Sequence, residues 1–173
     1  AFANAVIMIL LANVPPNTVR GALWWMMGSV ADATWYTVAW LGAYIAIGMV
    51  YLLMYAPEID VLTLGEDSAA GLGVDVQRAT RRAFLASALI AAATVAAAGL
   101  IGFVGLIVPH MTRALGLSRQ RSMLAGCAII GAILVVASDL LARIVIPPSE
   151  LPLGAVTAVL GVPFFLVQLR RMR

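Results

Sequence analysis

The stretch "GLIGFVGLIVPHMTR", residues 99–113, ends an uncharged run of about 30 residues that begins at residue 83. A membrane-spanning helix needs about 20 apolar residues, so this run suits either one long crossing or two short arms. Two equal arms would each measure about 22 Å at 1.5 Å per residue, less than the roughly 30 Å of a hydrocarbon core. The choice between these arrangements determines which side of the membrane each charged loop faces.

The composition identifies the chain as a membrane protein. Hydrophobic residues make up 63% of it and charged residues 11%, against about 25% charged residues in a soluble domain. The mean hydropathy is +1.02. Long apolar runs occupy residues 35–55, 123–138 and 151–169, close to the length of a spanning helix. This pattern argues against a soluble core.

The basic residues indicate how the chain is threaded through the membrane. All 11 are arginines, and most lie in three clusters. The clusters are Arg78, Arg81 and Arg82; Arg113, Arg119 and Arg121; and Arg170, Arg171 and Arg173. Cytoplasmic loops collect basic residues, so the clusters should share one side. Only two crossings between residues 83 and 112 allow this, so the run is predicted to go out and return.

Glycines supply the permissive backbone that such a hairpin needs. Gly99, Gly102 and Gly105 lie near its middle, and Pro109 lies on its returning arm. Irregular backbone at membrane depth is tolerated where it is buried in protein or lines a wet cavity. These four residues are therefore candidates for a hinge beside a transport pathway. A longer helix followed by a short tilted one, without a role in transport, is the alternative.

The whole chain is predicted to be all-α, a polytopic transmembrane bundle of about six membrane segments that includes the short broken hairpin. The expected segments are residues 1–14, 35–55, 83–98, 100–114, 123–146 and 151–169. Residues 15–34 contain the patch "GALWWMMGSV", which is too short to span and predicts an interfacial helix. The aromatic belt expected around it consists of Trp24, Trp25, Trp35, Tyr36 and Trp40.

The longest polar stretch, residues 56–82, lies on the predicted cytoplasmic side. Its middle, residues 66–72, contains helix-forming residues between Gly65 and Gly73, which predicts one or two short helices bounded by turns. A short helix between two spans moves with both of them and would suit the docking of a soluble partner. A plain connection would be unusually long, although spacing alone leaves it open.

Two charged residues lie within a membrane segment near its outer end. Asp139 and Arg143 are four residues apart, a spacing that allows them to pair on one helix face. Ionisable residues at that depth are candidates for function, although snorkelling to the interface is the simpler explanation. The turn "PPSELP" brings Glu150 near Arg143 at the outer mouth. A structural ion pair and a contact with a partner protein both remain open.

No catalytic, metal or cofactor site is predicted. The chain has no lysine, so it contains no Walker A loop and cannot hydrolyse ATP by that route. Cys127 is the sole cysteine, so neither a disulfide framework nor a thiol-ligated metal site can be built from this chain. His110 has no partner at ligand spacing, and Met26 and Met27 suit interfacial packing beside tryptophans. No nucleophile, base and orienting group can be assembled.

Four motifs closely resemble the C-terminal half of FecCD-type permeases. They are "WWMMGS" (24–29), "LTLGEDSAAGLGV" (62–74), "GLIGFVGLIVPHMTRALG" (99–116) and "DLLARIVIPPSELPLGAVTAVLGVPFFLVQL" (139–169). These permeases are the membrane subunits of ATP-binding-cassette (ABC) importers for iron-siderophores, haem and vitamin B12. The resemblance implies that residues 1–173 form the C-terminal part of such a permease domain, in the inner membrane of a bacterium or archaeon. ATP would be hydrolysed by a separate subunit.

The resemblance also implies roles for residues and partners. The coupling helices that dock on the dimeric ATPase subunit would lie within residues 56–82. The matching positions are Leu64, Gly65, Glu66, Asp67, Ala70, Leu72, Gly73 and Val74. Arg143 would lie at the periplasmic face, where the matching arginine of the vitamin B12 importer receives a glutamate from the binding protein. A second permease subunit, a periplasmic or lipoprotein binding protein and a cytoplasmic C-terminus are expected.

The family's first helices have no counterpart here, so the chain is expected to be a fragment of a longer permease. The motifs do not specify the cargo, since siderophore, haem and corrinoid permeases share them. Two other classes remain as alternatives. One is an ion-coupled secondary carrier, for which Asp139 is the only acidic residue within a predicted span. The other is a membrane scaffold without transport.

Overall fold

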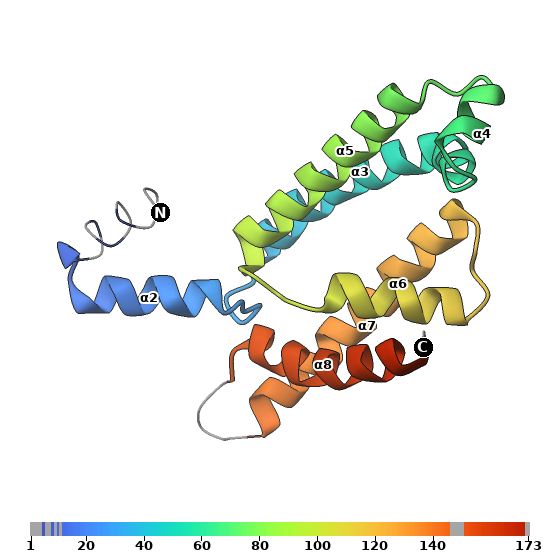
Figure 1. The fold of residues 1–173 in the computed structure, drawn as a ribbon. Helices are drawn as coiled ribbons and strands as arrows, with labels where there is room; N and C mark the ends of the chain where they lie inside the picture. Colours follow the sequence, from blue (N-terminus) through green and yellow to red (C-terminus); the bar gives the residue numbers. More distant parts are fainter. Residues whose placement is uncertain (1–4, 6–7, 9, 11, 146–150, 172–173) are drawn as a thin grey trace.

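The computed structural model describes residues 5, 8, 10, 12–145 and 151–171 (Figure 1). Every regular element in these ranges is a helix, which confirms the all-α prediction. The helices are α2 (Pro16–Met26), α3 (Trp35–Leu62), α4 (Glu66–Gly71), α5 (Val76–Ala98), α6 (Val104–Ala114), α7 (Gln120–Ile144) and α8 (Leu153–Arg171). The first expected membrane segment, residues 1–14, falls mostly outside the described ranges.

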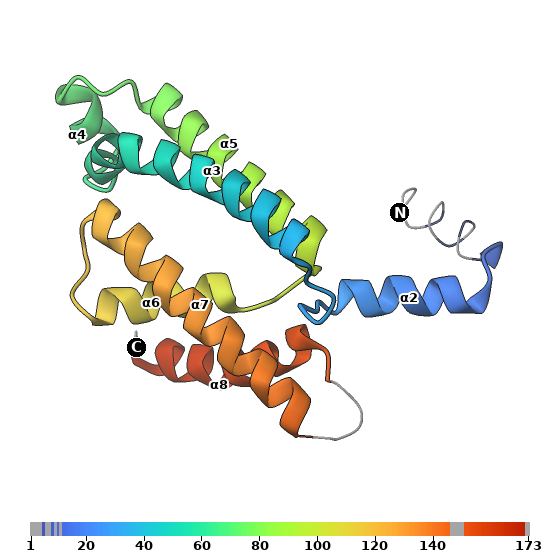
Figure 2. The ribbon, with the colours of Figure 1, turned by 180° about the vertical axis from the view of Figure 1, so that it is seen from behind.

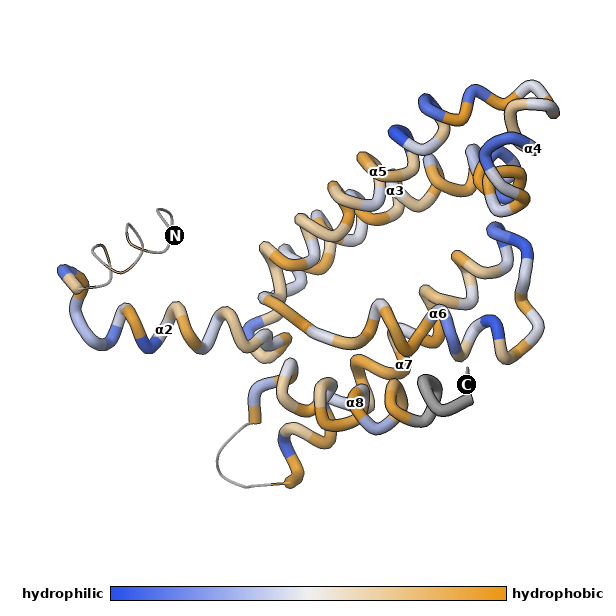
Figure 3. The backbone as a smooth tube through the Cα atoms, viewed as in Figure 1, coloured by the Kyte–Doolittle hydropathy of each residue, from blue (hydrophilic) through white to orange (hydrophobic). Residues whose placement is uncertain are grey.

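Three of the helices, α3, α5 and α7, are long and apolar enough to cross a membrane. A shorter apolar stretch, Leu153–Leu166, forms most of α8. Figure 3 shows hydrophobic residues along these helices and hydrophilic ones gathered around α4. Ala79 is the one buried residue of α5, so most of the apolar surface of that helix faces outward. The structure therefore confirms a multi-pass membrane protein, because a soluble fold would bury such helices.

The helices form two groups. α3 and α5 run side by side in opposite directions, with α4 between them at one end (Figure 1, Figure 2). The Ile90 side chain of α5 packs against Gly48 of α3, where an added Cβ would lie 2.6 Å from Ile90 Cγ1. The second group consists of α6, α7 and α8, and α7 also contacts α3. We call the end that carries α4 and the α6–α7 connection the α4 end, and the other the opposite end.

The chain reverses direction between α5 and α6, as the arginine clusters predict (Figure 1). The turn begins at Gly99, with φ 72° and ψ −165°, a conformation that is essentially restricted to glycine. It ends at Phe103, which has a left-handed backbone with φ 65° and precedes the first residue of α6. The Phe103 ring occupies the space where a side chain at Gly161 would lie, so the turn is packed against α8.

The two arms of this hairpin differ in length, whereas equal arms were expected. The 23 residues of α5 extend about 35 Å, a full crossing, and the 11 residues of α6 extend about 17 Å. α5 begins at Val76 because the Asp75 side chain caps it, accepting a hydrogen bond from Arg78 N at 3.0 Å. Arginine also favours helix and extends its charge toward water. The lengths thus match the alternative of a longer helix followed by a short one.

The segment predicted to be an interfacial helix contains α2. Proline occupies its first position, where the missing N–H costs no hydrogen bond, and no residue of α2 is buried. Trp24 and Trp25 are exposed on it, and Trp35 and Tyr36 at the start of α3 are 90% and 80% exposed. These aromatic side chains lie at the opposite end of the molecule. They belong to the aromatic belt that the sequence predicts at one membrane surface.

Candidate functional site

The α4 segment, residues 64–74, is held by a glycine at each side. Gly65 precedes α4 with φ 100° and ψ 154°, and Gly73 follows it with φ 83°. Residues other than glycine rarely adopt these backbone angles. Backbone bonds from Gly73 N to Ala70 O and from Val74 N to Ala69 O close the helix end. The structure confirms the predicted short helix between the two glycines.

The outer surface of this segment is apolar at both edges and acidic at its first turn. Leu64 and Leu72 are 63% and 65% exposed. Glu66 and Asp67 occupy the first turn of α4, where carboxylates interact favourably with the helix dipole. Ala69 faces inward and is fully buried. The segment therefore presents two leucines and two carboxylates to whatever lies beyond the α4 end.

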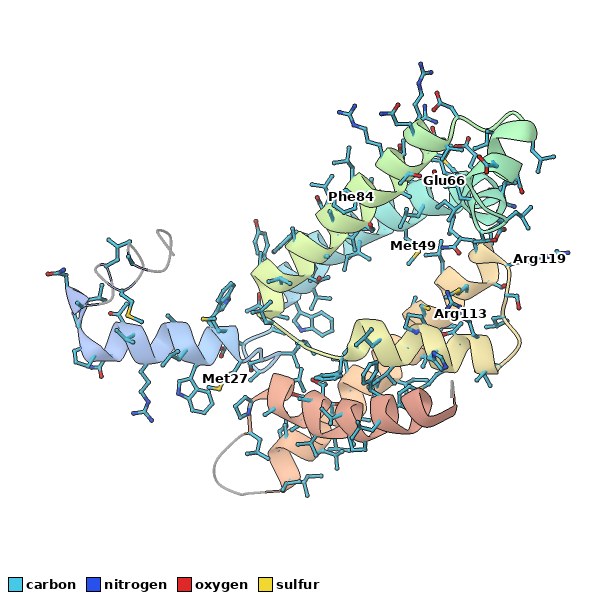
Figure 4. All side chains as sticks on the ribbon, in the orientation of Figure 1. Met27, Met49, Glu66, Phe84, Arg113 and Arg119 are labelled. Atoms are coloured by element: carbon cyan, nitrogen blue, oxygen red, sulfur yellow. The ribbon has the colours of Figure 1, made fainter. Side chains whose placement is uncertain are left out.

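Several arginines lie at the same end of the molecule as α4. Figure 4 shows Glu66, Arg113 and Arg119 at the same end of the molecule. Arg82 lies 3.9 Å from Glu58 and stacks over the Tyr55 ring, 5.0 Å from its centroid. The first two arginine clusters thus lie at one end. Residues 56–62 and 76–82 of the predicted polar loop belong to α3 and α5, which continue to this end as helices.

A side chain that sequence reasoning missed lies beside α4. Asp60, on the last turn of α3, accepts a hydrogen bond through Oδ1 from Gln120 N at 2.8 Å. Gln120 is the first residue of α7, and Arg119 at the N-cap position contributes no side-chain cap. The sequence offered one signal that α7 needs an acceptor from elsewhere: residue 119, immediately before the helix, is not one of the usual capping residues Ser, Thr, Asn or Asp.

At the opposite end the predicted pair of Asp139 and Arg143 is present. Arg143 Nε lies 2.9 Å from Asp139 Oδ2, and Arg143 Nη2 donates to Oδ1 at 3.3 Å. The arginine side chain is 44% exposed and the aspartate side chain 28% exposed. The fork holds the guanidinium near the last turn of α7, where a cation also suits the helix dipole. Glu150 lies outside the described residues.

The hinge candidates separate into two kinds. An added Cβ on Gly99 would collide with the carbonyl oxygen of Trp25 and lie 3.0 Å from Gly28 Cα, whereas one on Gly102 or Gly105 would meet nothing within 4 Å. Gly99 is therefore a packing position. Pro109 lies inside α6. The ring of His110, the residue after it, packs edge-on against the Phe164 ring of α8, with the two centroids 5.9 Å apart.

Three distant segments meet by their backbones around Gly99. Ser29 N donates to Ala98 O at 3.0 Å, and Gly154 N donates to Met27 O at 2.9 Å. The end of α2, the end of α5 and the start of α8 are thereby joined. A cavity of about 640 Å³ opens beside this junction. Its lining includes Trp24, Asp32, Thr37, Leu41, Ala97 and Leu151.

The sequence profile of the FecCD transport family matches residues 1–171. The chain belongs to the FecCD transport family. Curated relatives agree with this assignment. The vitamin B12 import system permease BtuC of Vibrio cholerae is 44% identical over 154 residues, which are 88% of this chain and 46% of the relative. The Fe(3+) dicitrate transport system permease FecD of Escherichia coli is 41% identical, covering 91% of this chain and 50% of the relative.

Another relative extends the range of cargoes named within the family. The hemin transport system permease HmuU of Yersinia pestis is 36% identical across 100% of this chain, which corresponds to 52% of the relative. The FecCD chain therefore spans about half the length of the curated relatives it matches. Each of these relatives is named as the permease protein of an import or transport system.

A solved structure shares the fold of this FecCD chain. It is described as a metal-chelate type ABC transporter in an inward-facing conformation, and it superposes with a TM-score of 0.86 at 29% sequence identity. The match covers 97% of this chain and 55% of that chain. The arrangement of α2 to α8 is thus one found in an ABC transporter.

Proposed function

We propose that this chain is the C-terminal part of the permease subunit of a binding-protein-dependent ABC importer. Its cargo is an iron-siderophore, haem or cobalamin-type chelate, which crosses the inner membrane without chemical change. Family membership supports this proposal, and so do relatives named for vitamin B12, hemin and ferric dicitrate. Because all three of these cargoes are metal complexes, a chelate is the cargo class that fits best.

The α4 segment is the observation that carries the proposal. It joins two helices that are each long enough to span a membrane, and it exposes Leu64, Leu72, Glu66 and Asp67 beyond their ends. A partner that pulls on α4 would therefore tilt α3 and α5 together as a packed unit. We assign this surface, Leu64 to Val74, to a dimeric ATPase subunit that supplies the energy, since this chain lacks the lysine of a Walker A loop.

The opposite end is the proposed docking face for the substrate-binding protein. Arg143 is fixed there by Asp139 with 44% of its side chain exposed, and Glu150 follows seven positions later in sequence. The arginine-rich α4 end and the C-terminus are then cytoplasmic by the positive-inside rule. A second permease subunit would complete the pathway, and the hinge candidates in this chain are Gly99, Gly102, Gly105 and Pro109.

Reversing the charge of Glu66 is expected to weaken ATPase binding by about tenfold. Glu66→Arg removes a carboxylate from the first turn of α4 and places a cation against the helix dipole, in a region already rich in arginine. The measurement is the affinity of the detergent-purified full-length permease for its ATPase subunit. Asp32→Arg, the same change at an exposed residue of the opposite end, is the matched control and should bind normally.

The outcomes of this binding experiment separate the alternatives. A wild-type permease that binds no ATPase would contradict the importer assignment and favour an ion-coupled carrier or a scaffold. Normal binding by both variants would keep the importer but remove Glu66 from the docking surface. Equal weakening by Asp32→Arg would show that the effect is not specific to α4.

A further inference from the structure

The α4 end contains a hydrogen bond between two helices that are far apart in sequence. Asp60 Oδ1 on α3 accepts from Gln120 N on α7 at 2.8 Å. The first N–H groups of any helix have no partner within the helix, and a side chain at the N-cap usually accepts from one of them. Here Arg119 occupies that position and provides no cap. Asp60 therefore performs for α7 what a local serine or aspartate performs in most helices.

The surroundings of α7 strengthen this interpretation. A carboxylate at a helix N-terminus also interacts favourably with the helix dipole. Both Asp60 and Gln120 are partly buried, which shields the bond from competing water. The contact thus attaches the start of α7 to α3.

Asp60 is itself held close to the α4 segment. Thr63 Oγ1 donates to Asp60 O at 2.7 Å, and Thr63 N bonds the same carbonyl at 3.2 Å. Leu64, the first residue of the α4 segment, follows directly. The α4 segment is therefore attached directly to the last turn of α3, where the Asp60 carboxylate lies.

From there α7 leads to the opposite end. Its 25 residues extend about 37 Å as one helix and end just beyond Arg143. The covalent route between the same two ends is longer, since it passes through α5, the glycine turn, α6 and the α6–α7 connection. Asp60 bridges this route with one side-chain hydrogen bond.

We propose that Asp60 is a positioning residue that couples the α4 segment to α7, so that movement of α4 shifts α7 and its Asp139–Arg143 pair. This inference rests on the proposed importer function. It adds a direct mechanical connection between the two docking faces, made by one carboxylate and one backbone N–H. The connection depends on an oxygen acceptor at residue 60, so asparagine can replace aspartate and alanine cannot.

The test uses the full-length permease assembled with its ATPase and reconstituted in liposomes with its binding protein. Three forms are compared: wild type, Asp60→Asn and Asp60→Ala. Asp60→Ala is expected to assemble with the ATPase and hydrolyse ATP at the basal rate, while stimulation of hydrolysis by loaded binding protein falls at least fivefold. Asp60→Asn should restore most of the stimulation. Hydrogen exchange of the amides of residues 120–123 should be about tenfold faster in Asp60→Ala.

Each result has one meaning. If Asp60→Ala retains full stimulation, or if Asp60→Asn fails to the same degree as alanine, the coupling role is wrong while the importer assignment stands. Loss of ATPase assembly and of thermal stability in Asp60→Ala would make the contact merely structural and would also overturn the proposal. If the wild-type permease does not associate with an ATPase at all, the proposed function itself fails.

Discussion

Replacing Gly99 by alanine is expected to destabilise the folded permease by about 3 kcal/mol. Two costs add. The backbone of Gly99, with φ 72° and ψ −165°, lies in a region that costs other residues about 1–3 kcal/mol. The new Cβ would also collide with the carbonyl oxygen of Trp25 and would lie 3.0 Å from Gly28 Cα. Neither the α2 end nor the α5 end can move away without breaking the bond between Ser29 N and Ala98 O.

The measurement for Gly99 is the thermal unfolding of the detergent-solubilised full-length permease, followed by the fraction that remains monodisperse on size exclusion. Gly102→Ala is the matched control, because it lies three residues away with open space around an added Cβ. It should change stability by less than about 0.5 kcal/mol. Equal effects of the two substitutions would contradict the assignment of Gly99 as a packing position and of Gly102 as an open one.

Reversing the charge of Arg143 is expected to weaken docking of the binding protein by about 100-fold, or roughly 2.7 kcal/mol. The fork to Asp139 holds the guanidinium at the opposite end of the bundle, with 44% of the side chain exposed. Arg143→Glu would replace this cation with a carboxylate beside Asp139. Two adjacent carboxylates would repel an acidic partner group, and like charges across an interface cost several kcal/mol.

The measurement for Arg143 is the affinity of the binding protein for the purified permease at two salt concentrations. Arg78→Glu reverses an equally basic side chain at the α4 end, where Arg78 pairs with Asp75 at 2.9 Å, and it should leave this affinity unchanged. Higher salt should reduce the difference between wild type and Arg143→Glu, because screening weakens exposed charge pairs. Wild-type affinity in Arg143→Glu would remove Arg143 from the docking face.

Sequence alone was sufficient wherever the decisive interactions are local. The apolar runs predict the long membrane helices, because burial in lipid depends on the composition of one segment. Gly65 and Gly73 predict the limits of α4, because a positive φ is a property of the residue itself. Spacing of four residues predicts the pair of Asp139 and Arg143 on one helix face.

Helix length was harder to predict. The uncharged run suggested that α5 begins near residue 83, whereas the helix begins at Val76 and includes three arginines. Charge marks where a chain meets water, and helix geometry continues past that point as long as a cap and helix-forming residues allow it. The hairpin therefore consists of a full crossing and a half crossing.

By itself, then, the sequence determined the membrane class, the positions of the long apolar segments, the short helix between two glycines and the family to which the chain belongs. Only the tertiary structure decided that Gly99 packs against Gly28 and that Asp60 caps α7. The physical reason is separation along the chain. These contacts join residues about 60 to 70 positions apart, and no local pattern of hydrophobicity or charge encodes which distant N–H a carboxylate will meet.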